Sequence, residues 1–263
     1  MLDHPTLEKL SALKFTGMLE ALKEQRQINA YADLSFEERL GMLVDREVTV
    51  RENRRMACRM KAAALRLPAA VEDINFRHPR GLDKSLFLSL TTCEWIRKHR
   101  NCLITGPTGV GKSYIACALA QKACREGFKA RYQRMSRLLD ELVVARHDGT
   151  YYAKLGALAQ VNVLILDDWG ITPLTDNNRQ DLLELLDDRY NRRSTIVTSQ
   201  LPVKKWHEYL ANPTLADAIL DRLVHNSHEL DLSGDSIRRF DATTDENEQS
   251  IKPEEMVNKQ ARR

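Results

Sequence analysis

A glycine-rich loop between a predicted strand and a predicted helix constrains this chain more than any other feature. The stretch CLITGPTGVGKSYIACALA covers residues 102–120, and its segment GPTGVGKS at 106–113 fits the pattern G-x-x-x-x-G-K-[ST]. Glycines permit backbone angles that side chains forbid, so successive N–H groups can converge on phosphate oxygens. The N-terminus of the following helix adds partial positive charge at the same point. The loop therefore predicts a site for a nucleoside triphosphate.

The last two residues of this loop have separate predicted roles. Lys112 is expected to reach the β- and γ-phosphates and to take part in catalysis, and Ser113 is expected to bind Mg²⁺. The predicted ATP-binding residues of the loop are Gly106, Pro107, Thr108, Gly109, Val110, Gly111, Lys112 and Ser113.

A second motif places two carboxylates after an apolar run, in the sequence VNVLILDDWG at 161–170. A wholly apolar strand is typical of the middle of a parallel sheet, where both faces are buried. Acids at its carboxyl end would lie beside the phosphate loop, because open α/β sheets bind ligands at that edge. We expect Asp167 to hold Mg²⁺, through water, and Asp168 to orient or deprotonate the attacking water.

The region around these motifs alternates between strand and helix patterns, which predicts an α/β fold. Helices are expected near 84–97, 112–126, 136–160, 178–192 and 211–225. Five strands, predicted to form a parallel sheet flanked by helices, are NCLIT (101–105), KARYQR (129–134), VNVLIL (161–166), STIVTS (194–199) and HELDL (228–232).

The first part of the chain predicts an all-α region. Apolar residues recur there at helical spacing, and Ser35 with Glu38 has the form of a capping box. A helix from there to about Leu67, ended by Pro68, would be about 45–50 Å long. The basic side chains of its second half could form a solvated face or a stripe that faces phosphates.

The expected organisation has four parts. A helical domain for oligomer, partner and DNA contacts covers 1–70, a linker 71–83, the ATPase domain 84–240, and a tail that is predicted to be disordered 241–263.

Composition sets limits on compartment and partners. The five cysteines form no C-x-x-C pair, which argues against zinc and disulfide frameworks and favours a reducing compartment. No signal peptide or membrane span is predicted, so we expect a cytoplasmic protein without a membrane partner. A net charge of +3 does not by itself identify a partner.

The ordered motifs carry a family resemblance over about residues 80–240. GPTGVGKS, VLILDDWG, TIVTSQLP, LADAILDRLVHNS and LDLSGDSIRR resemble AAA+ ATPases of the helicase-loader clade, and most closely the IstB-like ATPases that assist transposases of insertion sequences. The N-terminal LEKLSALKFTGMLEALKEQ resembles the same family. The resemblance implies an AAA+ core with a separate N-terminal helical region.

The resemblance also implies roles for single residues. The end of TIVTSQ is similar to sensor 1, which gives Gln200, with Ser199 as the alternative. DRL resembles the segment with the arginine finger, which gives Arg222, with Arg189 and Arg193 as weaker candidates. GDSIR matches sensor 2, which gives Arg238 as an ATP contact. Asp168 stands where many AAA+ ATPases have Glu, so slow hydrolysis is expected.

DNA contacts are expected in the segment after the second strand, where helicase-loader relatives carry a helical insertion that touches DNA. The predicted contacts are Arg134, Arg137, Tyr151 and Lys154, with Tyr152 as the alternative ring and core packing as the alternative role of either tyrosine. Lysine and arginine give affinity for phosphates without base reading, so binding to double-stranded DNA should be largely independent of sequence.

These expectations combine into one function. ATP would assemble subunits on duplex DNA, the oligomer would deform the DNA and recruit a transposase, and hydrolysis would dismantle the assembly. A replicative helicase loader of the DnaC type is the alternative, and a small-molecule kinase is a weaker one that leaves Arg222 and Arg238 unexplained.

Overall fold

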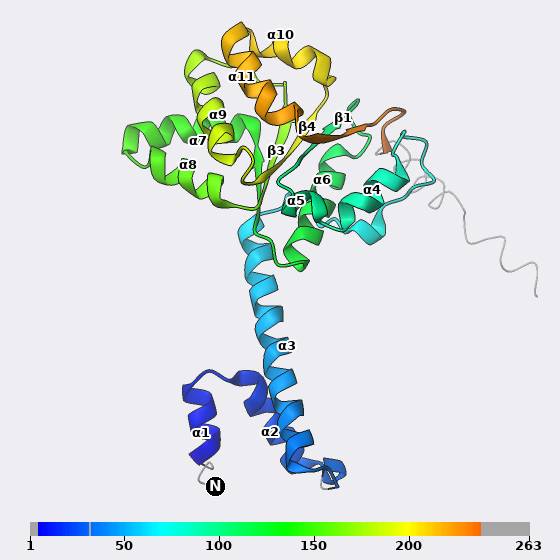
Figure 1. Ribbon diagram of the computed structural model, residues 1–263, viewed down its shortest axis with the longest axis vertical. Helices are drawn as coiled ribbons and strands as arrows, with labels where there is room; N and C mark the ends of the chain where they lie inside the picture. Colours follow the sequence, from blue (N-terminus) through cyan, green and yellow to red (C-terminus); the bar gives the residue numbers. More distant parts are fainter. Residues whose placement is uncertain (1–4, 32, 238–263) are drawn as a thin grey trace, which may run out of the picture. The chain divides into compact units, whose positions relative to one another are not determined.

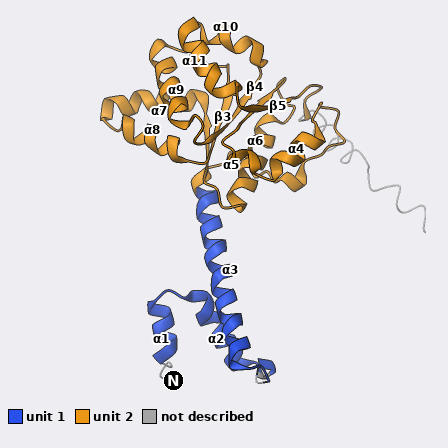
Figure 2. Cartoon of the chain, in the orientation of Figure 1, with its two compact units in different colours: residues 1–61 blue, residues 62–263 orange. Residues whose placement is uncertain are grey.

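The computed structural model describes residues 5–31 and 33–237 (Figure 1). The chain divides into two compact units, Met1–Lys61 and Ala62–Arg263 (Figure 2). Within the described ranges, no helix combines the length and the apolar character that a bilayer span requires. The predicted tail at 241–263 and the predicted sensor 2 residue Arg238 lie outside the described residues.

The first unit is helical. Its elements are α1 (Pro5–Ala12), α2 (Thr16–Gln27), the 3-10 helix η1 (Asn29–Tyr31) and α3 (Phe36–Ala63), whose last two residues belong to the second unit. The predicted capping box before α3 is confirmed. The Ser35 N–H donates to Glu38 Oε2 at 2.8 Å, and the Glu38 N–H donates to Ser35 Oγ at 3.3 Å.

A buried carboxylate joins α2 to α3. Glu47 Oε2 accepts from the N–H groups of Gly17 at 2.7 Å and Met18 at 3.2 Å, and Glu47 Oε1 accepts from Arg51 Nε at 2.7 Å. A carboxylate at a helix N-terminus satisfies free N–H groups and complements the helix dipole. A Cβ at position 17 would lie 2.7 Å from the Arg46 carbonyl oxygen, so this helix crossing requires glycine.

The long helix ends earlier than predicted. The sequence places its end near Leu67, but α3 stops at Ala63, and Ala64 has a left-handed φ of 48°. Its 28 residues give a length of about 42 Å. Pro68 disfavours helical geometry at Leu67. The residues between Ala63 and Pro68 therefore form a non-helical segment of the second unit.

The second unit is built on a five-stranded parallel sheet in the order β2-β3-β4-β1-β5, which confirms the predicted fold class. The strands are β1 (Asn101–Thr105), β2 (Ala130–Arg134), β3 (Val163–Trp169), β4 (Ser194–Ser199) and β5 (Ser227–Asp231). The helices are η2 (Val71–Asp73), α4 (Lys84–Thr91), α5 (Glu94–Arg97), α6 (Lys112–Arg125), α7 (Met135–Asp148), α8 (Tyr151–Gln160), α9 (Asp176–Arg189), η3 (Val203–Lys205), α10 (Trp206–Leu210) and α11 (Pro213–Val224).

Helices cover both faces of this sheet. Alternate strand residues, including Leu103, Leu164 and Val197, enter one apolar cluster with side chains of α7, α8, α9, α10 and α11. Helix α6 contacts β1, β2, β3 and β4 and packs on the opposite face (Figure 1). Parallel strands place all their carboxyl ends at one edge, so the loops after β1, β3 and β4 meet there.

Four predicted helices are interrupted or differ in their bounds by two residues or more, and one of them, predicted at 178–192, is α9 (Asp176–Arg189). Cys93, with a left-handed φ of 61°, separates α4 from α5 within the predicted helix 84–97. Gly149, at φ 77°, ends α7 before α8 begins. The predicted helix 211–225 starts at Pro213, and the short helix α10 before it was not predicted.

Arg189 is expected to be a structural residue with a large effect on stability. Its side chain is 1% exposed and donates to the carbonyl oxygens of Leu158 at 2.7 Å and Val161 at 2.9 Å, and also to Ser194 O. Burial lowers the pKa of Arg189 to about 9. Because Arg189→Met leaves several buried acceptors unpaired, it should lower the free energy of unfolding by about 3 kcal/mol or more in urea denaturation.

Arg193→Met is the matched control, because the guanidinium of this half-exposed side chain donates to the Gln160 and Arg192 carbonyl oxygens at the surface. Its change should stay within about 0.5 kcal/mol. Equal decreases for both variants would contradict the structural role. The burial of Arg189 also removes it as a candidate arginine finger.

Candidate functional site

The phosphate loop joins the carboxyl end of β1 to the N-terminus of α6. Gly106 and Gly109 have φ of 138° and 89°, angles that L side chains rarely adopt. A Cβ at Gly106 would collide with the Leu232 carbonyl, and one at Gly109 would collide with Ser236. The loop is therefore held closely against the segment after β5, and both positions require glycine.

Lys112 lies inside the curve of this loop. Its Nζ donates to the carbonyl oxygens of Gly106 and Pro107, each at 2.7 Å. Burial lowers the pKa of Lys112, and the charges of Asp167 and Asp168 oppose that shift. The ammonium group thus sits at the helix N-terminus, between the loop backbone and the acid pair.

Asp167 is fully buried at the end of β3 and accepts from three hydroxyl groups. Ser113 Oγ donates to Oδ1 at 2.7 Å, Thr198 Oγ1 donates to the same oxygen, and Tyr132 Oη donates to Oδ2 at 2.5 Å. Burial, followed by the bond to Asp167, raises the pKa of Tyr132, which keeps this phenol a donor.

A carboxylate and a hydroxyl this close fit Mg²⁺, which takes oxygen ligands and is usually held by one or two carboxylates together with substrate phosphates. Ser113 and Asp167 would hold the ion. When bound, it would neutralise charge on the phosphates.

Asp168 is the second acid, and its carboxylate has a different partner from that of Asp167. It has a left-handed φ of 65°, and its N–H donates to Thr198 Oγ1 at 3.2 Å. Its carboxylate oxygen Oδ2 lies 2.7 Å from Arg134 Nε, and its side chain is 24% exposed. It therefore faces the cavity beside the loop.

Arg134, a predicted DNA contact, has a partner within the site. It ends β2, and the pairing of β2 with β3 brings its guanidinium to the carboxylate of Asp168. The side chain lines the same cavity as the phosphate loop.

A cavity of about 710 Å³ lies over these groups. Gln200 lines it, whereas Ser199 is buried and its hydroxyl donates to the Trp169 carbonyl oxygen at 2.8 Å. Gln200 is therefore accessible from the cavity, and Ser199 is not. The lining residues also include Thr108, Gly109, Gly111, Lys112, Ser113, Asp168 and Ile171.

The segment predicted as a linker forms another wall of this cavity, through Asp73, Ile74, Asn75, His78 and Arg80. Arg80 is 3% exposed, and its guanidinium donates to the carbonyl oxygens of Val110 and Asn75, both at 3.3 Å. Sequence reasoning missed this role, because proline and irregular composition predict a loop but not what the loop covers.

Thr198 is a second residue that sequence reasoning missed. One hydroxyl donates to the Asp167 carboxylate and accepts from the Asp168 N–H, so it orients both acids. The sequence shows a hydroxyl residue near the end of the predicted strand 194–199. Only the pairing of β3 with β4 shows that this hydroxyl lies beside the two acids.

Arg222 lies at the opposite edge of the sheet. The Asn101 side chain, at the start of β1, donates to the carbonyl oxygens of Arg222 at 2.9 Å and Leu223 at 3.0 Å. The phosphate loop begins after Thr105, roughly 15 Å further along the strand. Arg222 Nε donates to Asp187 Oδ1 at 2.6 Å, and its Nη1 donates to the Ala218 carbonyl oxygen at 2.8 Å.

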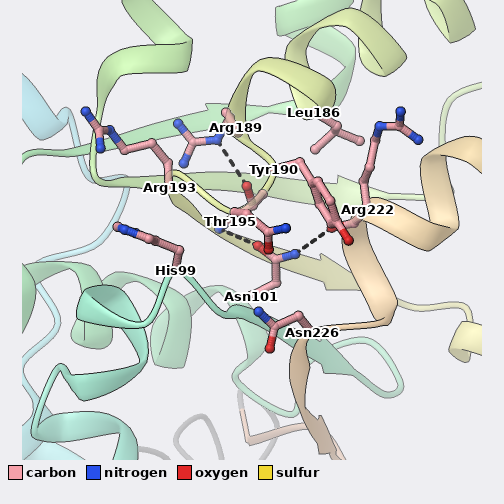
Figure 3. A pocket seen from close by; sticks show the side chains of 10 residues that line it. His99, Asn101, Leu186, Arg189, Tyr190, Arg193, Thr195, Arg222 and Asn226 are labelled. Atoms are coloured by element: carbon pink, nitrogen blue, oxygen red, sulfur yellow. Dashed lines mark hydrogen bonds between the residues drawn. The ribbon is translucent and has the colours of Figure 1, made fainter.

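Figure 3 shows Arg193 and Arg222 on opposite sides of a pocket at this edge, with Asn101 between them. Both guanidinium groups lie at the edge of the sheet opposite the phosphate loop, too far away to contact a nucleotide bound by the same protomer.

The remaining predicted DNA contacts differ in accessibility. Tyr151 is 5% exposed, and its hydroxyl donates to Asp181 Oδ1 at 2.7 Å and Glu184 Oε2 at 3.0 Å. The structure thus contradicts a base-stacking role for Tyr151, because its ring packs in the core. Tyr152 is 78% exposed. Arg137 and Lys154 are surface side chains that both pair with Glu141, at 3.1 and 2.7 Å.

The fold and the site define a class: a P-loop ATPase of the AAA+ type, with the phosphate loop after β1 and the acid pair near the carboxyl end of β3. A family model described as IstB-like ATP binding protein matches residues 8–244. The chain belongs to this family of ATPases.

Relatives agree with this assignment. A protein of Sinorhizobium fredii, named as insertion sequence ATP-binding protein y4pL, is 53% identical over 91% of this chain and 98% of its own length. An insertion sequence IS21 ATP-binding protein of Pseudomonas aeruginosa is 33% identical over 87% of this chain and 86% of its own length.

Solved structures support the fold. The crystal structure of DnaI has a TM-score of 0.54 and 20% identity, and the match covers 63% of this chain and 91% of that one. AMPPCP-bound DnaA from Aquifex aeolicus has a TM-score of 0.53 and 16% identity, with 73% and 59% coverage.

Proposed function

We propose that this ATPase assembles on duplex DNA in its ATP-bound state, deforms the DNA and assists a transposase, with Mg²⁺ as the metal of the site. The observation that carries the proposal is the separation of Arg222 from the phosphate loop across the sheet. A guanidinium at that edge can act on a nucleotide of the neighbouring protomer, which would make nucleotide binding and assembly depend on each other.

The catalytic roles follow from the site. Lys112 would bind the β- and γ-phosphates, Gln200 would contact the γ-phosphate, and Asp168 would accept the proton of the attacking water. Arg134 holds the Asp168 carboxylate at 2.7 Å, so this ion pair must loosen before Asp168 can act as a base. Together with the shorter side chain of Asp compared with Glu, this supports slow hydrolysis.

The DNA surface would lie on α7 and α8. Arg137, Tyr152 and Lys154 are its accessible members, and Tyr152 takes the stacking role that was expected for Tyr151. Lysine and arginine contacts to phosphates release counterions and do not read bases. Residues 1–70 remain proposed as a helical domain for oligomer, partner and DNA contacts, and residues 71–83 remain proposed as a linker.

A transposase is the proposed partner, because relatives are named as insertion sequence proteins. A transposase reading frame directly beside the gene is expected. A helicase loader shares the ATPase core, and binding to a replicative helicase instead of a transposase would favour that alternative.

Fluorescence anisotropy on a labelled duplex tests the proposal. We expect DNA affinity to be about 5–150-fold tighter with a non-hydrolysable ATP analogue than with ADP, the usual range of coupling between two sites. Equal affinities would contradict it. Arg137→Ala combined with Lys154→Ala should reduce the salt slope by about one for each phosphate that is no longer bound. Lys129→Ala, an exposed charge outside these helices, is the matched control.

A further inference from the structure

Arg66 lies outside every motif of the sequence and yet contacts the buried acid of the site. Its Nη1 is 3.5 Å from Asp167 Oδ2, the oxygen that also accepts from the Tyr132 hydroxyl. Its side chain is 44% exposed and lines the cavity that contains Lys112 and Ser113. Arg66 therefore borders both the metal-binding carboxylate and the space for the phosphates.

The backbone around Arg66 is anchored within the second unit at several points. Arg131 Nη1 donates to the Ala62 carbonyl oxygen at 3.0 Å, and Ala69 is 3% exposed. The Cys117 sulfur contacts the backbone of Arg66 and Leu67. Segment 62–69 begins with the last two residues of α3. Because Arg66 belongs to this segment, a movement of its side chain would first change the backbone of residues 62–69.

Charge makes the contact between Arg66 and Asp167 exchangeable. A fully buried carboxylate needs a compensating charge, which Arg66 supplies. A divalent cation held by Ser113 and Asp167 would stand within a few ångströms of this guanidinium, and like charges at that distance repel strongly in a protein. A triphosphate in the cavity offers the guanidinium several anionic oxygens, which match its planar donors.

We propose that Arg66 is an exchangeable counterion of Asp167. Binding of the metal–nucleotide complex transfers its guanidinium from the carboxylate to the triphosphate and thereby changes the backbone of segment 62–69. The inference rests on the proposed metal–nucleotide site, and it adds a residue that competes with the metal and then binds the nucleotide.

The first test measures binding of a fluorescent ATP analogue as a function of Mg²⁺ concentration. In Arg66→Met the half-saturating Mg²⁺ concentration should fall about 2–5-fold, the range that a half-exposed ion pair supports. At saturating Mg²⁺ the same variant should bind the analogue more weakly, because methionine cannot donate to a phosphate. A merely structural defect would not strengthen the response to Mg²⁺ and at the same time weaken binding of the analogue.

Two further variants separate charge from side-chain shape. Arg66→Lys keeps the charge, so its Mg²⁺ dependence should stay close to that of the wild type. Arg55→Met removes an exposed arginine charge from α3 and should change neither quantity. Thermal unfolding identifies any loss of fold, and Arg66→Gln replaces Arg66→Met if the latter does not fold.

The second test is hydrogen–deuterium exchange of segment 62–69. Addition of Mg²⁺ to the wild type with a non-hydrolysable analogue should change its exchange, and Arg66→Met should show no such metal-dependent change. Two results would overturn the inference while leaving the proposed function intact. The first is that analogue binding by the wild type and by Arg66→Met depends on Mg²⁺ in the same way. The second is that hydrogen–deuterium exchange of the wild-type segment does not change when Mg²⁺ is added. Wild-type binding that never depends on Mg²⁺ would instead refute the metal assignment, and the inference with it.

Discussion

Arg222→Ala is expected to lower the ATPase rate of the assembled protein by about 10³–10⁵-fold, the contribution of an arginine finger. Nucleotide binding by an isolated protomer should be unchanged, because Arg222 lies across the sheet from the phosphate loop of its own chain. Steady-state phosphate release with DNA present measures the rate, and equilibrium binding of a fluorescent analogue measures the affinity.

Mixing two inactive variants shows whether the finger acts in trans. Arg222→Ala has an intact pocket, and Asp168→Asn has an intact arginine but lacks the proposed base. At an interface between them, the pocket of the first meets the arginine of the second, so activity should return on mixing. Continued inactivity of mixed assemblies that form normally on DNA would contradict action in trans.

Arg193→Ala is the comparison for Arg222→Ala, since both guanidinium groups belong to the same edge of the sheet (Figure 3). The Arg193 side chain is half-exposed, and its guanidinium donates to the Gln160 and Arg192 carbonyl oxygens. A much larger decrease in rate for Arg193→Ala than for Arg222→Ala would transfer the finger role to Arg193.

Lys112→Ala should lower the rate of hydrolysis by about 10²–10³-fold or more, the usual cost of removing one preorganised electrostatic contact to the reacting group. It should also weaken assembly on DNA, because the γ-phosphate would no longer be held between two protomers. Phosphate release measures the first effect, and electron microscopy with DNA in ATP and ADP measures the second.

Lys122→Ala is the matched control, because this lysine lies on the same helix and pairs with Glu126 at 2.6 Å, away from the loop. If Lys112→Ala protomers gathered on DNA as readily as the wild type, nucleotide-dependent assembly would be refuted.

Local patterns were sufficient to predict much of the fold. The five strands, the phosphate loop and the Ser35–Glu38 capping box each depend on residues that are neighbours in the chain. The apolar runs, the glycines before Lys112 and the two acids near the carboxyl end of β3 can each be interpreted from residues a few positions apart. The position of each strand's carboxyl end then follows from the parallel arrangement alone.

Long-range pairing decided what these patterns could not. The register of β2 on β3 places Arg134 beside Asp168, and burial against α9 makes Tyr151 a core residue. The irregular segment 68–83 becomes a wall of the cavity, and Arg66 reaches Asp167 although the two residues are far apart along the chain.

The physical reason is the range of the interactions. Backbone angles, capping and strand propensity act within a few residues, so the sequence by itself determined the elements and the loop that binds phosphate. The partner of a charged side chain is whichever group the packed fold brings next to it, and only the tertiary structure decided that Arg134 and Arg66 neutralise the acids of the site while Arg222 lies at the opposite edge.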